Sequence, residues 1–468
     1  MKRGFLNSPK AQAKLATPAP SDRATQFLDL ASQSQQAGGL KRAAVNMDGY
    51  KSETQMKEFD GNTNDYQDSH WIVSRQPATP NDASLAEFPD GWAECFITGR
   101  AKRAILSTPG FPEALPRADS ARPIPYEIRE SSGKGMGMFA TRDIECGELI
   151  MAERPMLVIP AAYAPAVPVH FTPAQQQQAV LNEMEKILEQ MVGRMPEEMQ
   201  RAYKELSNCH QEDGSGPLFG IARTNGLSVS DYYEPAQPGL PDSARYYSAT
   251  CKILSRINHS CCPNAHRDWD SPTFSYYLYS VRAIKKDEEI TINYLGEAFD
   301  STASRQRQVT SYGFQCSCKR CQNPARSDKR AKEIMEYARP QPPPVQTMML
   351  VPGMMPSIGG NEDVKKKTID PSLKGLKMMD EDGLQNSWRY GELLKRLSEA
   401  YTTMGPGYEE EVKKWKELHK KHWTVHMGAR NIDTKEEHEK QKNGEVPQNA
   451  IEAIMKMMQG MNMGGRAS

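Results

Sequence analysis

The alternation of apolar and polar residues between positions 126 and 160 predicts a β-rich domain. The stretch reads YEIRE, then a glycine-rich turn, MFATRDI, the turn ECGE and LIMAERPMLVIP. A period of two with many β-branched residues is typical of short paired strands. We therefore expect a set of short strands joined by tight turns to begin at Tyr126.

The period becomes helical between Thr172 and Cys209. Thr172 is suited to the N-cap position, and Pro173 is suited to the first helical position. Apolar residues then recur on one helical face, at Val180, Met184, Ile187, Leu188 and Met191. We predict a helical insertion at about 172–209 within the β-rich domain.

Strand character returns after this insertion in two runs, TFSYYLYSVRAI and EEITINY. The polar sequence KKD lies between them, and its Asp287 tolerates the dihedral angles of a tight turn. The pattern predicts that the two runs pair as a β-hairpin.

The flanking sequences differ from the β-rich domain in composition. Residues 1–84 are rich in Ser, Gln, Asn, Asp and Ala with few clustered apolar positions, which predicts disorder. Residues 85–125 carry short apolar groups between Pro and Gly, and we expect them to lie against the next domain. Residues 325–383 contain the Pro- and Met-rich run of a linker. Residues 384–468 regain helical spacing, which predicts two antiparallel helices and a third from Ile451.

Composition narrows the functional classes. The chain has 468 residues with 59 Lys plus Arg and 59 Asp plus Glu, so no overall field draws it to nucleic acid or to an anionic membrane. No run approaches the roughly 20 apolar residues needed to cross a bilayer. The N-terminus lacks the apolar stretch of a secretory signal. We expect a protein of the nucleus or cytoplasm, with a mitochondrial presequence as the alternative reading of the basic N-terminus.

The cysteines indicate a metal site. The chain has nine, and five of them fall between Cys261 and Cys321, which fits a metal in a reducing compartment better than a disulfide framework. The spacing Cys-x-Cys-x-x-Cys at Cys316, Cys318 and Cys321 places three soft ligands in one tight turn, whereas structural zinc takes four. The fourth ligand must come from elsewhere in the chain.

Gly133, Gly135 and Gly137 could be taken for a dinucleotide-binding loop. Such a loop leads into a helix whose N-terminus holds the phosphate. The sequence MFATRDIECGEL that follows has the pattern of a strand and a turn, so we exclude a nucleotide-binding loop.

Five ordered stretches resemble the SET-domain protein-lysine methyltransferases, in particular their SET-and-MYND branch. They read GKGMGMFA, RTNGLSV, RINHSCCPNA, EEITINY and TSYGFQCSCKRC, and they cover about residues 126–324. The zinc-binding MYND module of that branch is missing, because its interval offers only ligands at spacings unlike a zinc finger: Cys146, His170, Cys209 and His210. The helical insertion takes its place.

The resemblance implies an α+β fold. Residues 126–300 would form a SET domain in which small β-sheets surround a pseudoknot, residues 301–324 a post-SET zinc clip, and the C-terminal part a small α-helical region. Residues 85–125 become a pre-SET segment. The zinc ligands implied are Cys261, Cys316, Cys318 and Cys321, with Cys262 the less favoured fourth donor.

The resemblance also implies a pocket for S-adenosylmethionine. In this family the backbone of the glycine turn lies along the methionine end of the cofactor, which makes Lys134 and Met136 candidate contacts. Asn225 and Asn258 offer donor and acceptor groups for an amino-acid zwitterion or an adenine edge. His259 is expected to contribute backbone contact and packing rather than general-base chemistry.

Tyr294, at the end of ITINY, is predicted to contact the cofactor and to carry catalysis. Methyl transfer from a sulfonium is an in-line displacement, and the attacking lysine must be neutral, which costs about 4.6 kcal/mol at pH 7. An apolar channel disfavours the ammonium, and the phenol can orient the amine lone pair. Tyr312 and Phe314 match the aromatic pair that walls the cofactor and the lysine channel in the family, so the zinc clip is expected to position the channel.

The sequence therefore predicts methyl transfer from S-adenosylmethionine to a lysine side chain of a histone or another protein. One alternative is an inactive SET-fold zinc protein that binds a partner through its C-terminal helices. The other is a zinc-dependent nucleic-acid binder, although a basic run is more often a solvated surface. The basic residues concerned are Lys319, Arg320, Arg326, Lys329 and Arg330.

Overall fold

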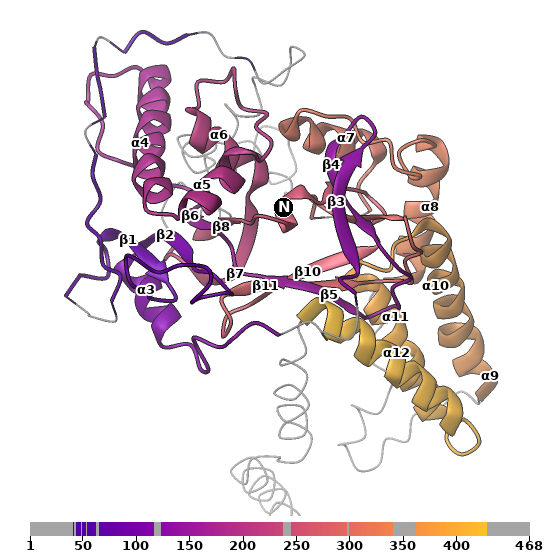
Figure 1. Ribbon diagram of the computed structural model, residues 1–468. Coiled ribbons are helices and arrows are strands. Elements are labelled where there is room, and N and C mark those ends of the chain that lie inside the picture. Colours follow the sequence, from indigo (N-terminus) through magenta and orange to yellow (C-terminus); the bar gives the residue numbers. More distant parts are fainter. Residues whose placement is uncertain are drawn as a thin grey trace, which may run out of the picture. The chain divides into compact units, whose positions relative to one another are not determined.

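The computed structural model describes residues 41, 44–47, 49–52, 54–61, 65–116, 123–236, 245–296, 299–339 and 361–427. The chain, whose helices and strands are labelled in Figure 1, divides into two compact units. The first comprises Met1–Gln341 and Lys374–Tyr390, and the second comprises Pro342–Leu373 and Gly391–Ser468. Among the described helices, none combines the length and the apolar character that a membrane span requires.

One sheet of the first unit has five strands. In spatial order these are β1 (Trp71–Gln76), β2 (Ala93–Thr98), β6 (Leu157–Pro160), β8 (Tyr246–Thr250) and β7 (Leu227–Tyr233). Neighbouring residues of β1 face two different cores, since Ile72 joins the core of the strands while Val73 packs toward the helices. The prediction of disorder for residues 1–84 is therefore wrong at β1, which pairs with β2 and is buried on both faces.

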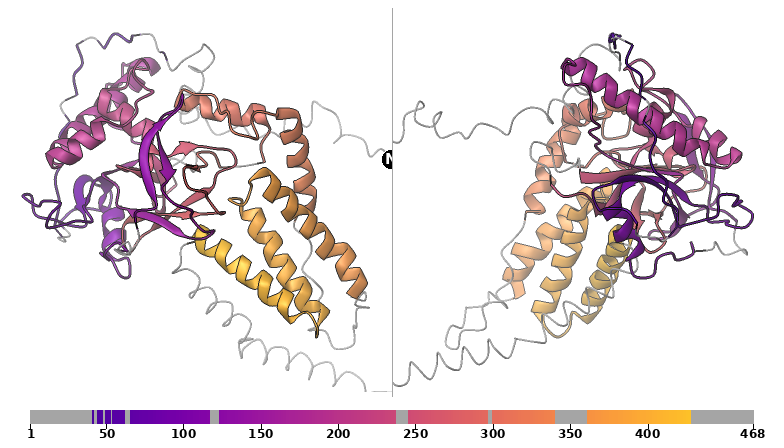
Figure 2. Two further views of the ribbon diagram at one scale, coloured as in Figure 1. Left: turned by 45° about the vertical axis from the view of Figure 1, so that its right-hand side comes forward. Right: turned by 90° about the vertical axis from the view of Figure 1, so that its left-hand side faces the viewer.

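The pre-SET segment and the insertion contribute helices to the same unit. Helix α3 (Gly99–Leu106) follows β2, and helices α4 (Pro173–Gly193), α5 (Glu197–Lys204) and α6 (Pro217–Asn225) cover one face of the five-stranded sheet (Figure 2). The Thr172 side chain accepts from the Gln175 amide, and the Gln175 side chain bonds back to the Thr172 amide. This capping box confirms the predicted helix start.

A four-stranded sheet contains the glycine turn. Its order is β3 (Tyr126–Ser131), β4 (Gly135–Ala140), β12 (Glu289–Ile292) and β9 (Asn258–His259). Gly133 and Gly135 have φ angles of 72° and 75°, a left-handed backbone that glycine adopts without strain. The turn leads into strand β4, which confirms that it is not a phosphate loop.

A three-stranded sheet contradicts the hairpin predicted from the runs around KKD. Strand β11 (Ser275–Ser280) pairs with β10 (Ala265–Asp270) and with β5 (Leu149–Glu153), whereas β12 belongs to the four-stranded sheet. Asp287 does adopt a left-handed φ of 67°, but its amide donates to the carbonyl of Ala140 at 2.8 Å. The turn therefore passes the chain from one sheet to another.

Helices follow the last strand. In the first unit they are α7 (Thr302–Val309), α8 (Pro324–Tyr337) and most of α10 (Asp370–Asp382), with a 3-10 turn at Thr310–Tyr312; another 3-10 turn, Leu254–Arg256, lies between β8 and β9. The linker predicted at 325–383 is wrong at both ends, because α8 and α10 are helices with buried apolar residues such as Ile334 and Met379. The Pro- and Met-rich run itself falls outside the described residues.

The second unit is helical over its described residues. It contains α9 (Asn361–Val364), a π-helical turn (Lys365–Ile369), most of α11 (Trp388–Met404) and α12 (Glu409–Met427). Gly391 near the start of α11 lies against His422 near the end of α12, so the two helices run antiparallel, as predicted. The third helix predicted from Ile451 lies outside the described residues, and a partner for these helices stays a prediction.

Candidate functional site

The site forms where strands β9 and β12 run side by side. Their parallel pairing places Asn258 opposite Thr291 and His259 opposite Ile292. This register brings the segment NHSCCPN next to Tyr294, which follows the end of β12. Two stretches more than thirty residues apart in the chain thereby present their polar side chains at one place.

Four cysteines of the site form a compact cluster. Their Sγ atoms all lie within 4.8 Å of one another, and Cys261 Sγ is 3.9 Å from Cys316 Sγ and 3.6 Å from Cys321 Sγ. Zinc–sulfur bonds of about 2.3 Å place tetrahedral sulfurs about 3.8 Å apart. The predicted set Cys261, Cys316, Cys318 and Cys321 therefore fits a structural zinc ion, and Cys262 is not part of it.

A buried cation accompanies the thiols. The guanidinium of Arg305 lies 3.9 Å from Cys321 Sγ and also donates to the hydroxyls of Thr302 and Ser327, and only 1% of Arg305 is exposed. Four thiolates on a bound Zn²⁺ would leave two negative charges at this place. Arg305 would offset part of that charge, because a buried charge needs an opposite charge and hydrogen bonds nearby.

His259 connects the thiol cluster to Tyr294. Its Nδ1 accepts a hydrogen bond from the Tyr294 amide at 3.1 Å, and its Nε2 lies 3.3 Å from Cys261 Sγ. Burial lowers the pKa of His259 to about 4, so the ring is neutral. Since Nδ1 accepts, the ring proton sits on Nε2 and points at the sulfur. From the sequence, His259 is expected to provide only packing and backbone contact, and nothing in the spacing of the residues indicates that it bridges Tyr294 and Cys261.

The larger of two adjoining cavities has a volume of about 900 Å³. Five of the predicted cofactor contacts line it, namely Lys134, Asn258, His259, Tyr312 and Phe314. The end of α10 contributes Asp380, Glu381, Asp382 and Gly383. Gly383 has a left-handed φ of 68° and comes so close to the Cys262 side chain that an added Cβ would lie 3.1 Å from it. Met136 does not line this cavity.

A hydrogen-bond network fixes Asn258 at the edge of the larger cavity. Its amide nitrogen donates to the Met136 carbonyl at 3.1 Å and to Glu289 at 2.8 Å. Glu289 also accepts from Lys134 at 2.7 Å and from Ser131 at 2.8 Å. Burial acts to raise the pKa of Glu289, but these donors hold it below its usual value. Among the described residues, no group donates a hydrogen bond to the side-chain oxygen of Asn258. This oxygen can therefore accept one from a ligand.

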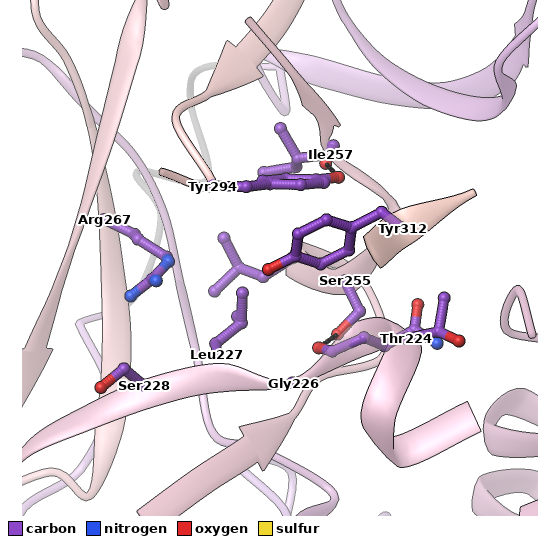
Figure 3. Close-up of a pocket in the computed structure, with 11 residues that line it drawn as sticks. Thr224, Gly226, Leu227, Ser228, Ser255, Ile257, Arg267, Tyr294 and Tyr312 are labelled. Atoms are coloured by element: carbon purple, nitrogen blue, oxygen red, sulfur yellow. Dashed lines mark hydrogen bonds between the residues drawn. The ribbon is translucent and has the colours of Figure 1, made fainter. Parts of the chain in front are cut away.

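The smaller cavity has a volume of about 160 Å³ (Figure 3). Tyr294 and Tyr312 lie along one part of it, and Arg267 enters from a different side (Figure 3). The other lining residues are Thr224, Asn225, Gly226, Leu227, Ser228, Leu254, Ser255 and Ile257. Asn225, predicted as a cofactor contact, thus lines this cavity and not the larger one, and its amide donates to the carbonyls of Ser207 and Ile221.

Tyr294 is held rigidly. Its hydroxyl donates to the Ile257 carbonyl at 2.5 Å, and its ring centroid lies 5.1 Å from that of Tyr312 and 5.2 Å from that of His259. Burial raises the pKa of Tyr294, so the phenol stays protonated. With its proton committed to Ile257, the phenol oxygen presents its lone pairs to a donor in the cavity.

The basic run is held by the end of α10. Arg330 lies 2.6 Å from Glu381, Arg326 lies 3.5 Å from Asp382, and Arg320 is buried. Arg330 and Arg326 are thus paired with acidic groups, whereas the Lys329 side chain is 79% exposed, and nucleic-acid binding stays an untested alternative. The described residues hold no second group of three or more metal-ligating side chains, in line with the missing MYND module.

Comparisons with known proteins identify a SET domain in this chain. A family model described as the SET domain matches residues 135–295. The chain is 26% identical over 219 residues to histone-lysine N-methyltransferase set5 of Schizosaccharomyces pombe, covering 46% of this chain and 57% of that protein. It is 33% identical over 138 residues to histone-lysine N-methyltransferase ATXR2 of Arabidopsis thaliana, covering 23% and 28%.

SET-and-MYND proteins are also among the relatives. SET domain and MYND-type zinc finger protein 6 of Schizosaccharomyces pombe is 38% identical over 71 residues, covering 15% of this chain and 14% of that protein. The aligned parts span from about one seventh to just over half of the length of these three relatives.

Proposed function

Because this chain contains a SET domain at residues 135–295, we propose that it transfers methyl groups from S-adenosylmethionine to the side-chain amine of a protein lysine. The observation that carries the proposal is the position of Tyr312, which lines both cavities. A donor in the larger cavity and an amine in the smaller one would meet at this ring. Such a meeting is what a direct displacement between two substrates requires.

The larger cavity suits the methyl donor. S-Adenosylmethionine, when bound, supplies a sulfonium methyl group that a nucleophile can displace. Lys134 and the free carbonyl oxygen of Asn258 would hold its charged amino-acid end, and Phe314 offers an aromatic face to a cationic sulfur or a planar base. The packing of His259 against Phe314, with ring centroids 6.1 Å apart, connects this wall to the thiol cluster.

The smaller cavity suits the lysine side chain. A protein cavity of about 150 Å³ accommodates benzene, so about 160 Å³ accommodates four methylenes and an amine. The Tyr294 oxygen would accept an N–H from the amine, which turns the nitrogen lone pair toward the donor. Tyr294 cannot act as a phenolate base near neutral pH, since burial raises its pKa. Its proposed role is orientation.

Histones are the first substrates to test, because relatives of this chain are named as histone-lysine N-methyltransferases. We place the activity in the nucleus or cytoplasm for the same reason. The experiment incubates the full chain with labelled S-adenosylmethionine and either core histones or a cell extract, beside Tyr294→Phe. As a matched control we choose Tyr233→Phe, since Tyr233 is 56% exposed and lines neither cavity.

We expect protein labelling that falls at least about 100-fold in Tyr294→Phe and is unchanged in Tyr233→Phe. Equal labelling by Tyr294→Phe would remove that residue from the reaction. If calorimetry detects no binding of S-adenosylmethionine to the wild-type chain, the enzyme proposal fails, and the alternative of an inactive scaffold takes its place.

A further inference from the structure

Arg267 is the one charged side chain that lines the smaller cavity. It lies on strand β10, and its guanidinium sits over the ring of Tyr276 at 5.6 Å from the centroid. Its buried Nε has no hydrogen-bond partner, and none of the described residues forms an ion pair with it. A guanidinium in this state keeps its full positive charge and directs its field into the cavity.

No carboxylate lines the smaller cavity to balance this charge. Burial raises the pKa of Tyr294 and that of Tyr312, so both phenols remain neutral while the guanidinium stays charged. The lining of the cavity therefore carries one positive charge, that of Arg267. A protonated lysine, which carries the same sign, would be an unfavourable occupant.

We propose that Arg267 makes the smaller cavity select the neutral amine of the target lysine. This inference rests on the proposed function and deepens it, because it names a residue whose charge disfavours the protonated form of the nucleophile, so that the amine releases its proton to water. A like charge nearby disfavours the ammonium and lowers the pKa of the bound amine. Arg267 does not touch the methyl group, so it acts as a positioning residue through its charge.

Other titratable groups surround the cavity and have to be considered. Among the described residues, three interact electrostatically with Arg267, namely Asp268, Cys251 and Tyr276. Glu289 interacts with Tyr294, and Cys209 interacts with Tyr312. Asp231, Asp270 and Glu153 interact with members of the first three, and Lys252 interacts with Glu153. Burial raises the pKa of both Asp268 and Glu153 to about 7, so these two titrate where the enzyme would be assayed. Neither lines the cavity. Asp268 follows Arg267 on β10 and so points to the opposite face of the strand.

The test is the pH dependence of turnover by the full chain on core histones, between pH 6 and pH 10. The dependence of kcat reports the amine bound in the complex, whereas that of kcat/KM reports the free amine, with a pKa of about 10.4. Arg267→Met removes the charge, and Arg267→Lys keeps it. Asp268→Asn and Glu153→Gln are controls for the neighbouring acids.

We expect Arg267→Met to move the rising limb of kcat upward by about one pH unit, so that turnover falls about tenfold at pH 7 and recovers near pH 10. Arg267→Lys should keep the wild-type limb, and so should both acid controls. Calorimetry with S-adenosylmethionine checks folding. Should the Met variant fail to bind, Arg267→Gln replaces it in the same comparison.

Two results would overturn the inference while the proposed function stands. A raised KM with an unmoved kcat limb would mean that Arg267 binds an acceptor on the substrate. An equal loss of kcat at every pH would mean that it only supports the cavity wall. Absence of methylation by the wild-type chain at every pH would instead refute the proposed function, and the inference with it.

Discussion

The bridge formed by His259 predicts that zinc affinity and turnover can be separated by two substitutions at one position. His259→Asn keeps an acceptor near the ring Nδ1, and so keeps the bond from the Tyr294 amide. His259→Gln keeps a donor near the ring Nε2, and so keeps the contact with Cys261 Sγ. Each variant removes one of the two interactions, at 3.1 and 3.3 Å, and retains the other.

The magnitudes follow from the burial of the ring, which is 6% exposed. A buried amide left without an acceptor costs about 1 to 3 kcal/mol. If this cost moves Tyr294 from its position, kcat in His259→Gln should fall about tenfold or more. Loss of the N–H contact to a zinc-bound thiolate should weaken zinc binding by about 10- to 100-fold in His259→Asn.

The assay measures zinc affinity by competition with a chromogenic chelator, and turnover in saturating zinc with labelled S-adenosylmethionine. We expect His259→Asn to lose zinc more readily but to turn over normally once zinc is restored. His259→Gln should retain zinc and turn over slowly. If both variants lose zinc affinity and turnover to the same extent, the ring acts only by packing and the bridge has no separate role.

Two further predictions concern buried charge. Arg305→Met should release zinc at a lower chelator concentration than the wild type, because it removes the cation 3.9 Å from Cys321 Sγ. Arg305→Lys, which keeps a positive charge, should lose less of its zinc affinity than the Met variant. Unchanged zinc retention in the Met variant would count against charge compensation. Burial raises the pKa of Asp268 to about 7, against about 3.9 in the unfolded chain. The neutral carboxyl therefore contributes stability that is fully present below about pH 4 and is lost as the pH rises to about 7. Unfolding by urea should therefore show Asp268→Asn gaining about 4 kcal/mol relative to the wild type between pH 4 and pH 8, and a constant difference across that range would contradict the assignment.

Local patterns were sufficient where one segment determines its own structure. The pair Thr172 and Pro173 starts a helix because capping and a fixed φ act within one turn, and the glycine turn after Ser131 gives a hairpin for the same reason. The spacing of the three late cysteines restricts them to one loop, so their convergence could be expected. Cys261 was predicted to be the fourth ligand only from the family resemblance.

Long-range pairing could not be obtained from the same patterns. The runs that form β11 and β12 both have strand periodicity, but periodicity does not tell which strand pairs with which, and the two strands entered different sheets. Strand β1 was missed because its six residues stand among polar ones. Their burial depends on pairing with β2, which the local pattern does not reveal. Arg267 gave no signal either, since one arginine on a strand is ordinary until the cavity around it is known.

The contribution of α10 to the larger cavity has a consequence for biosynthesis. Gly383, which closes the wall against Cys262, lies 69 residues beyond Phe314 in the order of translation. At about 5 to 20 residues per second, a ribosome needs about 3 to 14 seconds to cover that interval. For this time the nascent chain has the cysteines and aromatic residues of the site but lacks the part of the cavity wall that α10 supplies. The four clustered cysteines are thus synthesised before Gly383, and a zinc ion could bind them before α10 packs against Cys262.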